Sequence, residues 1–357
     1  MQRSTQGFGS LVSRFHRAGH LLLTVTLASS IMAFSQDVIV LKNGDRITGE
    51  VKKLENGNVH IDADYGGNIF IIDWEEVERI EIPTASPAHF SVVTSSGDRL
   101  SGSIRTDPDA PTRVLVEEQG STVSFEQSEL VSFTPIDAGF WGRFETSVDF
   151  GLSLTKANET KQFNTRARAS YLTDDWSLEG NLESLLNARQ DVPDTKRNEF
   201  GTNFRYFITN RWFSETFGNF LQSNKLQLDL RSSIGGAMGR YLVQNDRWLL
   251  SINGGGAWTN ENFEDPLVSN QNSGEVLGTL EFNAFNIGDL NILAKLSVFP
   301  SLSDLGRVRI NFRNDFKWDL PQDLYFRVGF TNNFDSSPLT DTPRNDYIFS
   351  TSVGWSH

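Results

Sequence analysis

Charged residues recur at every second position in the C-terminal part of this 357-residue chain, and the chemistry open to them is ion pairing. Arg307, Arg309 and Arg313 share one parity, with apolar residues between them, and Glu145 and Asp149 follow the same alternation further upstream. Guanidinium and carboxylate groups form strong pairs with each other, and an unpaired guanidinium binds anions. Alternation with period two places such charges on one face of a β-strand and the apolar residues on the other. The pattern therefore predicts a charged surface carried by strands.

The elements that would position these charges are twelve alternating segments. They are expected at residues 143–154, 163–172, 176–187, 198–208, 212–221, 225–241, 247–259, 275–285, 290–299, 307–318, 324–334 and 347–355. Twelve is an even number, as a single-chain bacterial outer-membrane barrel requires. A soluble β-sandwich alternates in the same way, so alternation alone does not decide between the two folds.

Loop lengths and tryptophan positions favour a membrane barrel. The connections at 173–175, 209–211, 243–246, 286–289 and 320–323 are short, whereas those at 156–162, 187–197, 260–274, 300–306 and 335–346 are mostly longer; only 222–224 breaks the rule. Outer-membrane barrels have short periplasmic turns and long external loops. Six tryptophans fall at the short-turn end, where an aromatic girdle would meet the lipid headgroups: Trp141, Trp176, Trp212, Trp248, Trp318 and Trp355.

Strand parity assigns a set of charged residues to the interior of such a barrel, because an Arg facing lipid at the midplane costs about 2–4 kcal/mol. The residues expected to face the lumen are Arg166, Arg168, Arg205, Arg231, Arg307, Arg309, Arg313, Glu145, Asp149, Glu179, Glu183, Asp229 and Asp315. They could line a narrow channel whose arginines favour anions. They could equally form an interlocked salt-bridge network that fills a closed barrel, since twelve strands lie between filled eight-stranded and open sixteen-stranded barrels.

Catalytic, metal and cofactor sites are not expected. The chain has no Cys, which excludes thiolate zinc sites and cysteine nucleophiles. A lipid-modifying barrel enzyme would need a general base near the outer leaflet, but the only His of the barrel part is His357, at the predicted periplasmic end. His60 and His89 are isolated in the sequence. The glycine runs Gly235–Gly239 and Gly254–Gly256 lack the strand-to-helix context of a phosphate loop.

An internal repeat precedes the barrel part. Gly44-Asp45-Arg46-Ile47-Thr48-Gly49 recurs 53 residues later as Gly97-Asp98-Arg99-Leu100-Ser101-Gly102, and the same offset relates Ile61 to Val114, Ala63 to Val116, Gly67 to Gly120, Val77 to Leu130 and Ile80 to Phe133. Two small SH3-like or Sm-like β modules are predicted, at 36–83 and 90–136, joined by Thr84–His89. Residues 36–136 contain 18 acidic and 8 basic side chains, a net charge of −10 that argues against nucleic acid.

The N-terminus has the pattern of an export signal. Arg3, Arg14 and Arg17 precede the apolar run 21–33, which is too short to span a bilayer comfortably and ends at Ala33-Phe34-Ser35. Residues 1–35 are therefore predicted to be a secretory signal peptide, cleaved between Ser35 and Gln36. An amphipathic or buried N-terminal helix is the alternative.

The part from 140 to 357 resembles the DUF481 family of salt-induced outer-membrane proteins. The residues that carry the resemblance are Trp141-Gly142 with Gly151, the segment Gly235-Gly236-Ala237-Met238-Gly239-Arg240-Tyr241-Leu242, and Phe299-Pro300-Ser301-Leu302. The resemblance implies an outer-membrane β-barrel without a defined activity. Outer-membrane proteins end in an aromatic that the barrel-assembly machinery reads, and here Trp355 stands two residues before the end.

The expected protein is all-β: two periplasmic SH3-like modules followed by a twelve-stranded antiparallel up-and-down transmembrane barrel in the outer membrane of a Gram-negative-type bacterium. Its expected partners are outer-membrane lipid, the barrel-assembly machinery and an envelope protein that docks on residues 38–136. The leading hypothesis is a structural protein or narrow pore without catalysis. The alternative is a closed barrel that anchors a partner-binding unit, and the third is a lipid-modifying enzyme.

Overall fold

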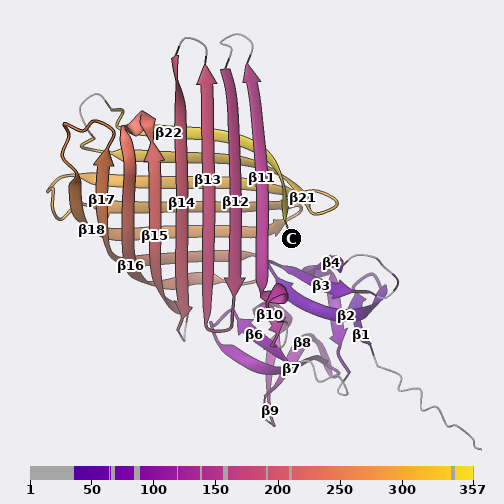
Figure 1. Ribbon diagram of the computed structural model, residues 1–357. Coiled ribbons are helices and arrows are strands. Elements are labelled where there is room, and N and C mark those ends of the chain that lie inside the picture. The colour runs from indigo at the N-terminus through magenta and orange to yellow at the C-terminus, as the bar shows by residue number, and fades with distance from the viewer. Residues whose placement is uncertain are drawn as a thin grey trace, which may run out of the picture. The chain divides into compact units, whose positions relative to one another are not determined.

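A computed structural model of the chain is shown in Figure 1. It describes residues 36–63, 65, 69–83, 89–118, 120–136, 139–155, 160–189, 192–208, 211–338 and 342–356. The predicted signal peptide with Ser35, most of the predicted linker at 84–89, and His357 lie outside the described residues. No helix in the described part of the chain is long and apolar enough to cross a membrane.

The C-terminal part is a closed barrel of twelve antiparallel strands, as the alternation predicts. Each strand pairs with its neighbours in sequence, and β22 returns to pair with β11. The strands are β11 (Phe144–Thr155), β12 (Thr160–Leu172), β13 (Trp176–Arg189), β14 (Val192–Phe207), β15 (Trp212–Ser223), β16 (Leu228–Gln244), β17 (Trp248–Phe263), β18 (Gln271–Ile287), β19 (Leu290–Pro300), β20 (Val308–Asp319), β21 (Leu324–Asp335) and β22 (Asn345–Ser356).

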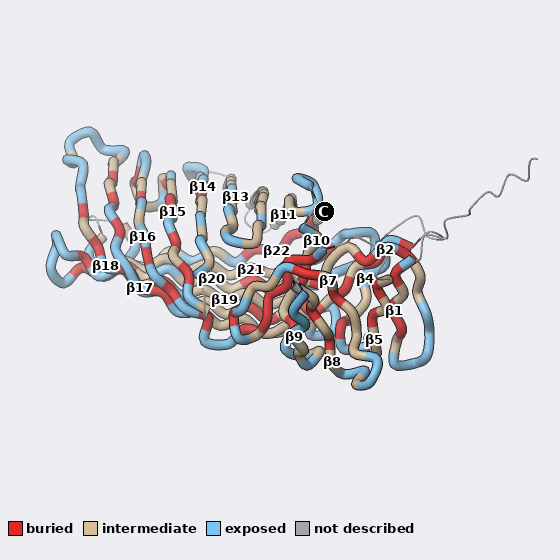
Figure 2. The backbone as a smooth tube through the Cα atoms, turned by 90° about the horizontal axis from the view of Figure 1, so that it is seen from below, coloured by how far each residue is buried: buried red, intermediate tan, exposed pale blue. Residues whose placement is uncertain are grey.

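Side chains alternate between the two faces of the barrel wall. Figure 2 shows buried and exposed residues alternating along β15 to β18. On β11, Phe150 is 65% exposed whereas the neighbouring Asp149 is only 1% exposed. A compact sandwich would bury Phe150 and expose Asp149, so this inversion is the expected signature of a membrane barrel.

The turn lengths follow the predicted asymmetry with two differences, of which the first is the loop predicted at 156–162: the bounds of β11 and β12 leave only four residues for it. The strand bounds leave two to four residues at the predicted short turns, for example between Leu172 and Trp176. At the other end, β17 and β18, β19 and β20, and β21 and β22 are joined by longer segments. The loop predicted at 187–197 is shorter than expected, because β13 and β14 continue almost to the tip of their hairpin. The start of β14 is polar, with Asp194, Lys196 and Arg197, so period-two alternation does not predict a strand there.

The N-terminal repeats form equivalent sets of five strands. The first set is β1 (Asp37–Leu41), β2 (Arg46–Glu55), β3 (Asn58–Asp62), β4 (Ile69–Asp73) and β5 (Val77–Glu81); the second is β6 (Phe90–Thr94), β7 (Arg99–Asp107), β8 (Ala110–Glu118), β9 (Ser121–Glu126) and β10 (Leu130–Pro135). A short 3-10 turn precedes the last strand of each set, at Trp74–Glu76 and Gln127–Glu129. We call β1 to β10 the repeat unit.

The two repeats share one core. β10 pairs with β6 of its own repeat and also with β2 of the first repeat, where Phe133 faces Leu54. One cluster of buried apolar side chains takes residues from both repeats, and the related pairs Val77 and Leu130, and Ile80 and Phe133, are all in it. The repeats are therefore joined in one ten-stranded sheet. Their predicted SH3-like or Sm-like character stays a prediction.

The repeated Gly-Asp-Arg motif has a structural explanation. Its first glycine, Gly44 or Gly97, has a φ of +90° or +86°, which a tight turn between two strands requires. Its last glycine in the first repeat, Gly49, approaches β3 so closely that a Cβ would lie 2.2 Å from the carbonyl oxygen of Asp62. The duplication therefore preserves a turn, and in the first repeat the motif also allows a close approach to β3.

Candidate functional site: the charged barrel interior

Several ion pairs join strands that are not neighbours in the barrel, and three of them connect strands that have three others between them. Their donor–acceptor distances are 3.1 Å for Arg166–Asp315, 3.2 Å for Arg197–Asp346 and 3.5 Å for Arg205–Glu281. Each pair skips three strands of the ring; for example, β21, β22 and β11 lie between β20 and β12. Such contacts can be made only across the inside of the barrel, so they show which face of these strands is internal.

The central cluster is organised by Arg166 of β12. Its guanidinium binds Glu183 on the adjacent strand and Asp315 across the barrel, both at 3.1 Å. Asp315 also accepts from Arg313 at 2.8 Å. The side chains of Arg166 and Asp315 are only 7% and 12% exposed. Because each charge has an opposite partner, the cluster avoids the several kcal/mol that an unpaired buried ion costs.

A second cluster lies toward the short-turn end. Arg205 pairs with Glu215 at 2.7 Å and donates to the hydroxyl of Tyr241 at 2.9 Å. Its guanidinium also lies over the ring of Phe213, 4.3 Å from the centroid, in a cation–π contact. Glu281, its partner across the barrel, is 3.6 Å from Lys295. This end of the interior is thus crossed by aromatic and charged side chains together.

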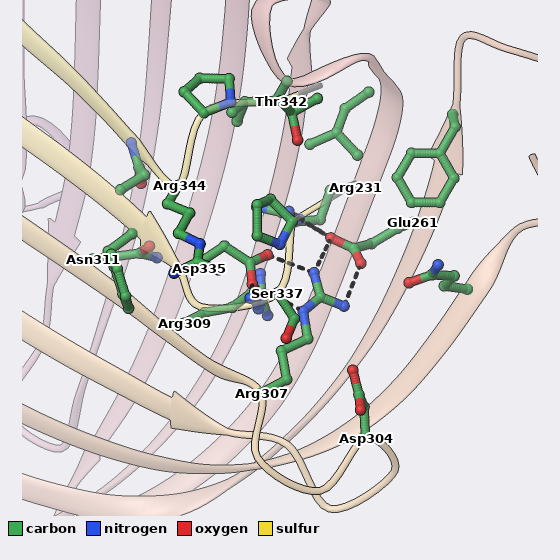
Figure 3. Close-up of a pocket in the computed structure, with 18 residues that line it drawn as sticks. Arg231, Glu261, Asp304, Arg307, Arg309, Asn311, Asp335, Ser337, Thr342 and Arg344 are labelled. Atoms are coloured by element: carbon green, nitrogen blue, oxygen red, sulfur yellow. Dashed lines mark hydrogen bonds and ion pairs between the residues drawn. The ribbon is translucent and has the colours of Figure 1, made fainter. Parts of the chain in front are cut away.

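A third cluster lies toward the long-loop end and is drawn in Figure 3. Arg307 lies between two carboxylates, 2.9 Å from Glu261 and 2.6 Å from Asp335, and Arg231 binds the same Glu261 at 2.5 Å. Arg309 pairs with Glu275 on β18 and, at 3.0 Å, with the hydroxyl of Thr259. A cavity of about 130 Å³ opens beside this cluster. The guanidinium groups of Arg231, Arg307 and Arg309, which line the cavity, are already paired with carboxylates.

A fourth cluster lies at the seam where the barrel closes. Asp149 of β11 accepts from Arg327 and from the hydroxyl of Tyr325, both at 2.8 Å, and from Ser352 of β22 at 3.1 Å. β11 and β22 pair over only four residues in register, from Ser147 with Ser356 to Phe150 with Val353. Polar side chains therefore add bonds where the backbone ladder is shortest.

The structure brings most of the charged residues that parity selects into the buried clusters, and it leaves four of them outside. Arg168 and Glu179 pair at 2.7 Å between neighbouring strands, and their side chains remain 50% and 37% exposed. Glu145 lies 3.5 Å from Lys53 of the repeat unit. Asp229 is exposed at a β-bulge between Leu228 and Leu230, and no ion pair among the described residues includes it. The inward orientation predicted for Asp229 stays a prediction.

Sequence reasoning missed several partners in these clusters. They are Arg197, Glu199, Glu215, Glu261, Glu275, Glu281, Arg327, Asp335 and Asp346. Parity would have found Glu215, Glu275 and Glu281, which lie in well-formed alternating strands. Arg197, Asp335 and Asp346 lie near strand ends that were assigned to loops, so no alternation marked them.

The predicted girdle tryptophans are mostly exposed on the barrel. Trp212, Trp248, Trp318 and Trp355 are 36–44% exposed and Trp141 is 77% exposed. Trp176 is half-buried against Tyr171 and Phe204, with ring centroids 5.6 and 5.8 Å apart. Within the described ranges, no group of three or more His, Cys, Asp or Glu side chains has the arrangement of a metal site.

Comparison with known proteins identifies the family. A family model described as "Protein of unknown function, DUF481" matches residues 148–356. No curated protein matches. A solved KdgM porin in complex with disordered oligogalacturonate is 10% identical and covers 59% of this chain and 99% of its own, with a TM-score of 0.33. The COG4313 outer-membrane channel from Pseudomonas putida F1 is 10% identical over 60% of this chain and 95% of its own, with a TM-score of 0.37. The translocator domain of the autotransporter NalP from Neisseria meningitidis is 11% identical over 60% of this chain and 86% of its own, with a TM-score of 0.33.

Proposed function

The chain belongs to the DUF481 family and is an outer-membrane β-barrel protein. From this premise we propose that it is a membrane anchor with a closed interior. The barrel holds the protein in the outer membrane, and the repeat unit works at the short-turn side, which in outer-membrane barrels is the periplasm. Envelope proteins and outer-membrane lipid are its proposed partners, and the barrel-assembly machinery inserts it.

The observation that supports a closed interior is the burial of the ion pairs that cross it. A water-filled pore leaves its lining charges exposed, as in large porins. Here Arg197 and Asp346, which meet across the barrel, have side chains only 4% and 15% exposed. Arg205 and Glu281 also meet across the barrel, and their side chains are 13% and 15% exposed. Charges that satisfy each other across the lumen occupy the space that a solute would need.

Conductance in planar bilayers tests the proposal. The wild-type protein is expected to give no steady channel. Replacing Glu183→Gln and Asp315→Asn together removes both partners of Arg166, so that this buried cation must recruit water and the interior loosens. Ion-conducting events are therefore expected from the double variant.

The matched control is Arg168→Gln. Among the described residues its ion pair is with Glu179 on the neighbouring strand, so its loss leaves the crossing pairs in place and should leave the membrane non-conducting. A steady conductance from the wild-type protein at rest would contradict the closed interior.

A narrow pore is the second candidate, and partly exposed charges favour it. Arg313 and Lys295 have side chains 31% and 35% exposed, and Arg168 has 50%. A path that follows these three cations would pass anions better than cations. In that case the wild-type protein conducts, and Arg313→Gln lowers its anion selectivity.

A further inference from the structure

Four successive short turns of the barrel contact the repeat unit. Arg99 of β7 donates to the carbonyl oxygen of Asp174, in the turn between β12 and β13. Arg211, between β14 and β15, donates to the carbonyl oxygen of Ser95 at 2.7 Å. Arg247, between β16 and β17, pairs with Glu75 at 2.7 Å. Finally, Asn286 at the end of β18 donates to Asn58 at 3.2 Å.

The contact is closely fitted at two glycines. A Cβ on Gly97 would lie 2.5 Å from the backbone nitrogen of Arg211, so no larger residue fits there without displacement. A Cβ on Gly57 would lie 3.3 Å from the carbonyl oxygen of Asp246. Arg99 is also stacked on Phe207 of β14, with its guanidinium carbon 4.1 Å from the ring centroid. These are packed contacts at defined places on both partners.

The position of these turns places the repeat unit over the short-turn opening. The four turns join β12 to β13, β14 to β15, β16 to β17 and β18 to β19, which together are eight of the twelve strands of the ring. The ion pair between Lys53 of β2 and Glu145 of β11, at 3.5 Å, adds a contact at a further strand. Because the repeat unit contacts all four turns and also β11, it must lie across the opening that these elements surround.

The interface is polar, and this distinguishes it from the two structures that it joins. The core cluster of the repeat unit contains no residue of the barrel. The contacts above are hydrogen bonds, ion pairs and one cation–π contact, and Arg247 and Glu75 have side chains 28% and 55% exposed. Exposed ion pairs contribute little each and are weakened by salt. The repeat unit can therefore separate from the barrel without loss of either fold.

We infer that the repeat unit is a releasable cap, which closes the short-turn mouth of the barrel and controls access of water-soluble molecules to its interior from that side. This function goes beyond anchoring, and it does not depend on whether the interior conducts. Arg99 and Arg247 hold the cap closed from opposite sides of the interface, since one belongs to the repeat unit and the other to the barrel.

A cysteine inside the mouth reports on the cap, and the chain has no cysteine of its own to interfere. Ser170 of β12 stands between Glu145 and Glu179 in the strand register, on the same face as Arg166 and Arg168, and close to the short-turn end. Ser170→Cys changes one atom. Its rate of reaction with a charged, water-soluble methanethiosulfonate reagent is measured in the full-length protein.

The reporter is compared in three backgrounds. With the cap intact, the reaction is expected to be slow. With Arg99→Gln and Arg247→Gln it is expected to be at least tenfold faster. The matched control is Arg46→Gln. Arg46 is the counterpart of Arg99 in the first repeat, but it pairs with Glu81 of its own repeat and has no hydrogen bond or ion pair to the described residues of the barrel. This variant should react at the slow rate.

A second measurement follows the position of the cap itself. Asn58→Cys with Asn286→Cys introduces two thiols where the side chains now share a hydrogen bond, and a short bifunctional thiol reagent should link them in the otherwise unchanged protein. The yield of this link should fall with Arg99→Gln and Arg247→Gln.

Two results would overturn the inference. An unchanged yield of the link would show that these arginines do not hold the cap. A reduced yield, together with an unchanged reaction rate of the Ser170→Cys reporter, would show that the repeat unit does not control access. Conductance of the wild-type protein, in contrast, would overturn only the closed interior.

Discussion

Trp74 and Gln127 occupy the same position in the two repeats, 53 residues apart, and each donates a hydrogen bond to the backbone of the other. Trp74 Nε1 donates to the carbonyl oxygen of Gln127, and Gln127 Nε2 donates to the carbonyl oxygen of Trp74, both at 3.1 Å. Gln127 Nε2 also donates to the carbonyl oxygen of Val77 at 3.0 Å. The reciprocal bonds join equivalent positions of the repeat unit and tie one repeat to the other.

Gln127→Ala should weaken the repeat unit. The substitution removes the donor for two part-buried carbonyl groups, which costs about 1–3 kcal/mol of unfolding free energy. Hydrogen exchange of the amides in β1 to β10 should become faster by the corresponding factor. The control is Ser128→Ala, an exposed change in the same 3-10 turn. Equal exchange in the two variants would show that the reciprocal bonds contribute nothing.

Gly354→Ala should weaken barrel closure. A Cβ on Gly354 would lie 2.3 Å from Tyr325 Cζ and 2.6 Å from Asp149 Cβ, at the short seam between β11 and β22. Overpacking of this kind costs about 1–3 kcal/mol. The temperature at which the protein loses its fast-migrating folded form in SDS gels should therefore fall.

The control for the seam is Gly278→Ala. Gly278 lies in β18, and a Cβ there would have no atom within 4 Å. Its folded form should resist heating as the wild type does. If both variants melt together, crowding at the seam has no effect on closure.

The repeat unit should become less stable in mild acid because of His60. The pKa of His60 is lowered to about 4, mainly by burial and also by the nearby Lys53, while Glu145 opposes the shift. Glu55 also lies 3.8 Å away. The folded pKa is below the ordinary 6.5, so the folded state binds fewer protons than the unfolded chain. This contribution is full above about pH 6.5 and is lost as the pH falls toward 4, by up to about 3 kcal/mol.

The measurement is amide exchange in β1 to β10 at about pH 7 and about pH 5, on either side of the ordinary histidine pKa, corrected for intrinsic rates. His60→Gln should remove most of the difference between the two pH values, whereas His89→Gln should keep it. An acid sensitivity that survives in His60→Gln would assign the effect to another group.

The exposed tryptophans of the barrel should lie at the membrane surface. Lipids brominated near the headgroup are expected to quench Trp212, which is 43% exposed, but not Trp74, which is 2% exposed within the repeat unit. The quenched fraction of the total fluorescence should therefore rise in Trp74→Phe and fall in Trp212→Phe. The opposite order would place the girdle outside the lipid.

Much of the fold could be predicted from the sequence, because a barrel in a membrane requires a particular alternation of side chains along each strand. Lipid on one side and polar side chains on the other force period-two alternation, and this marks strands such as β11 and β20 directly. The repeat was equally visible, since buried positions such as Ile80 and Phe133 recur at one offset. Strand ends were less visible: β14 begins with polar residues beyond the lipid-facing region, where alternation stops.

Partner choice was decided only by the tertiary structure. Parity places Arg166 and Asp315 on the inner face, but their contact depends on which strands come to face each other across a closed ring. The different fates of Arg46 and Arg99 show the same limit. The two residues stand at equivalent positions of the repeated motif, yet one pairs within its repeat and the other contacts the barrel, because two related surfaces cannot both face a single mouth. Local alternation and duplication are thus written in the sequence, whereas contacts between distant elements depend on how the ring closes and on which side of the repeat unit meets it.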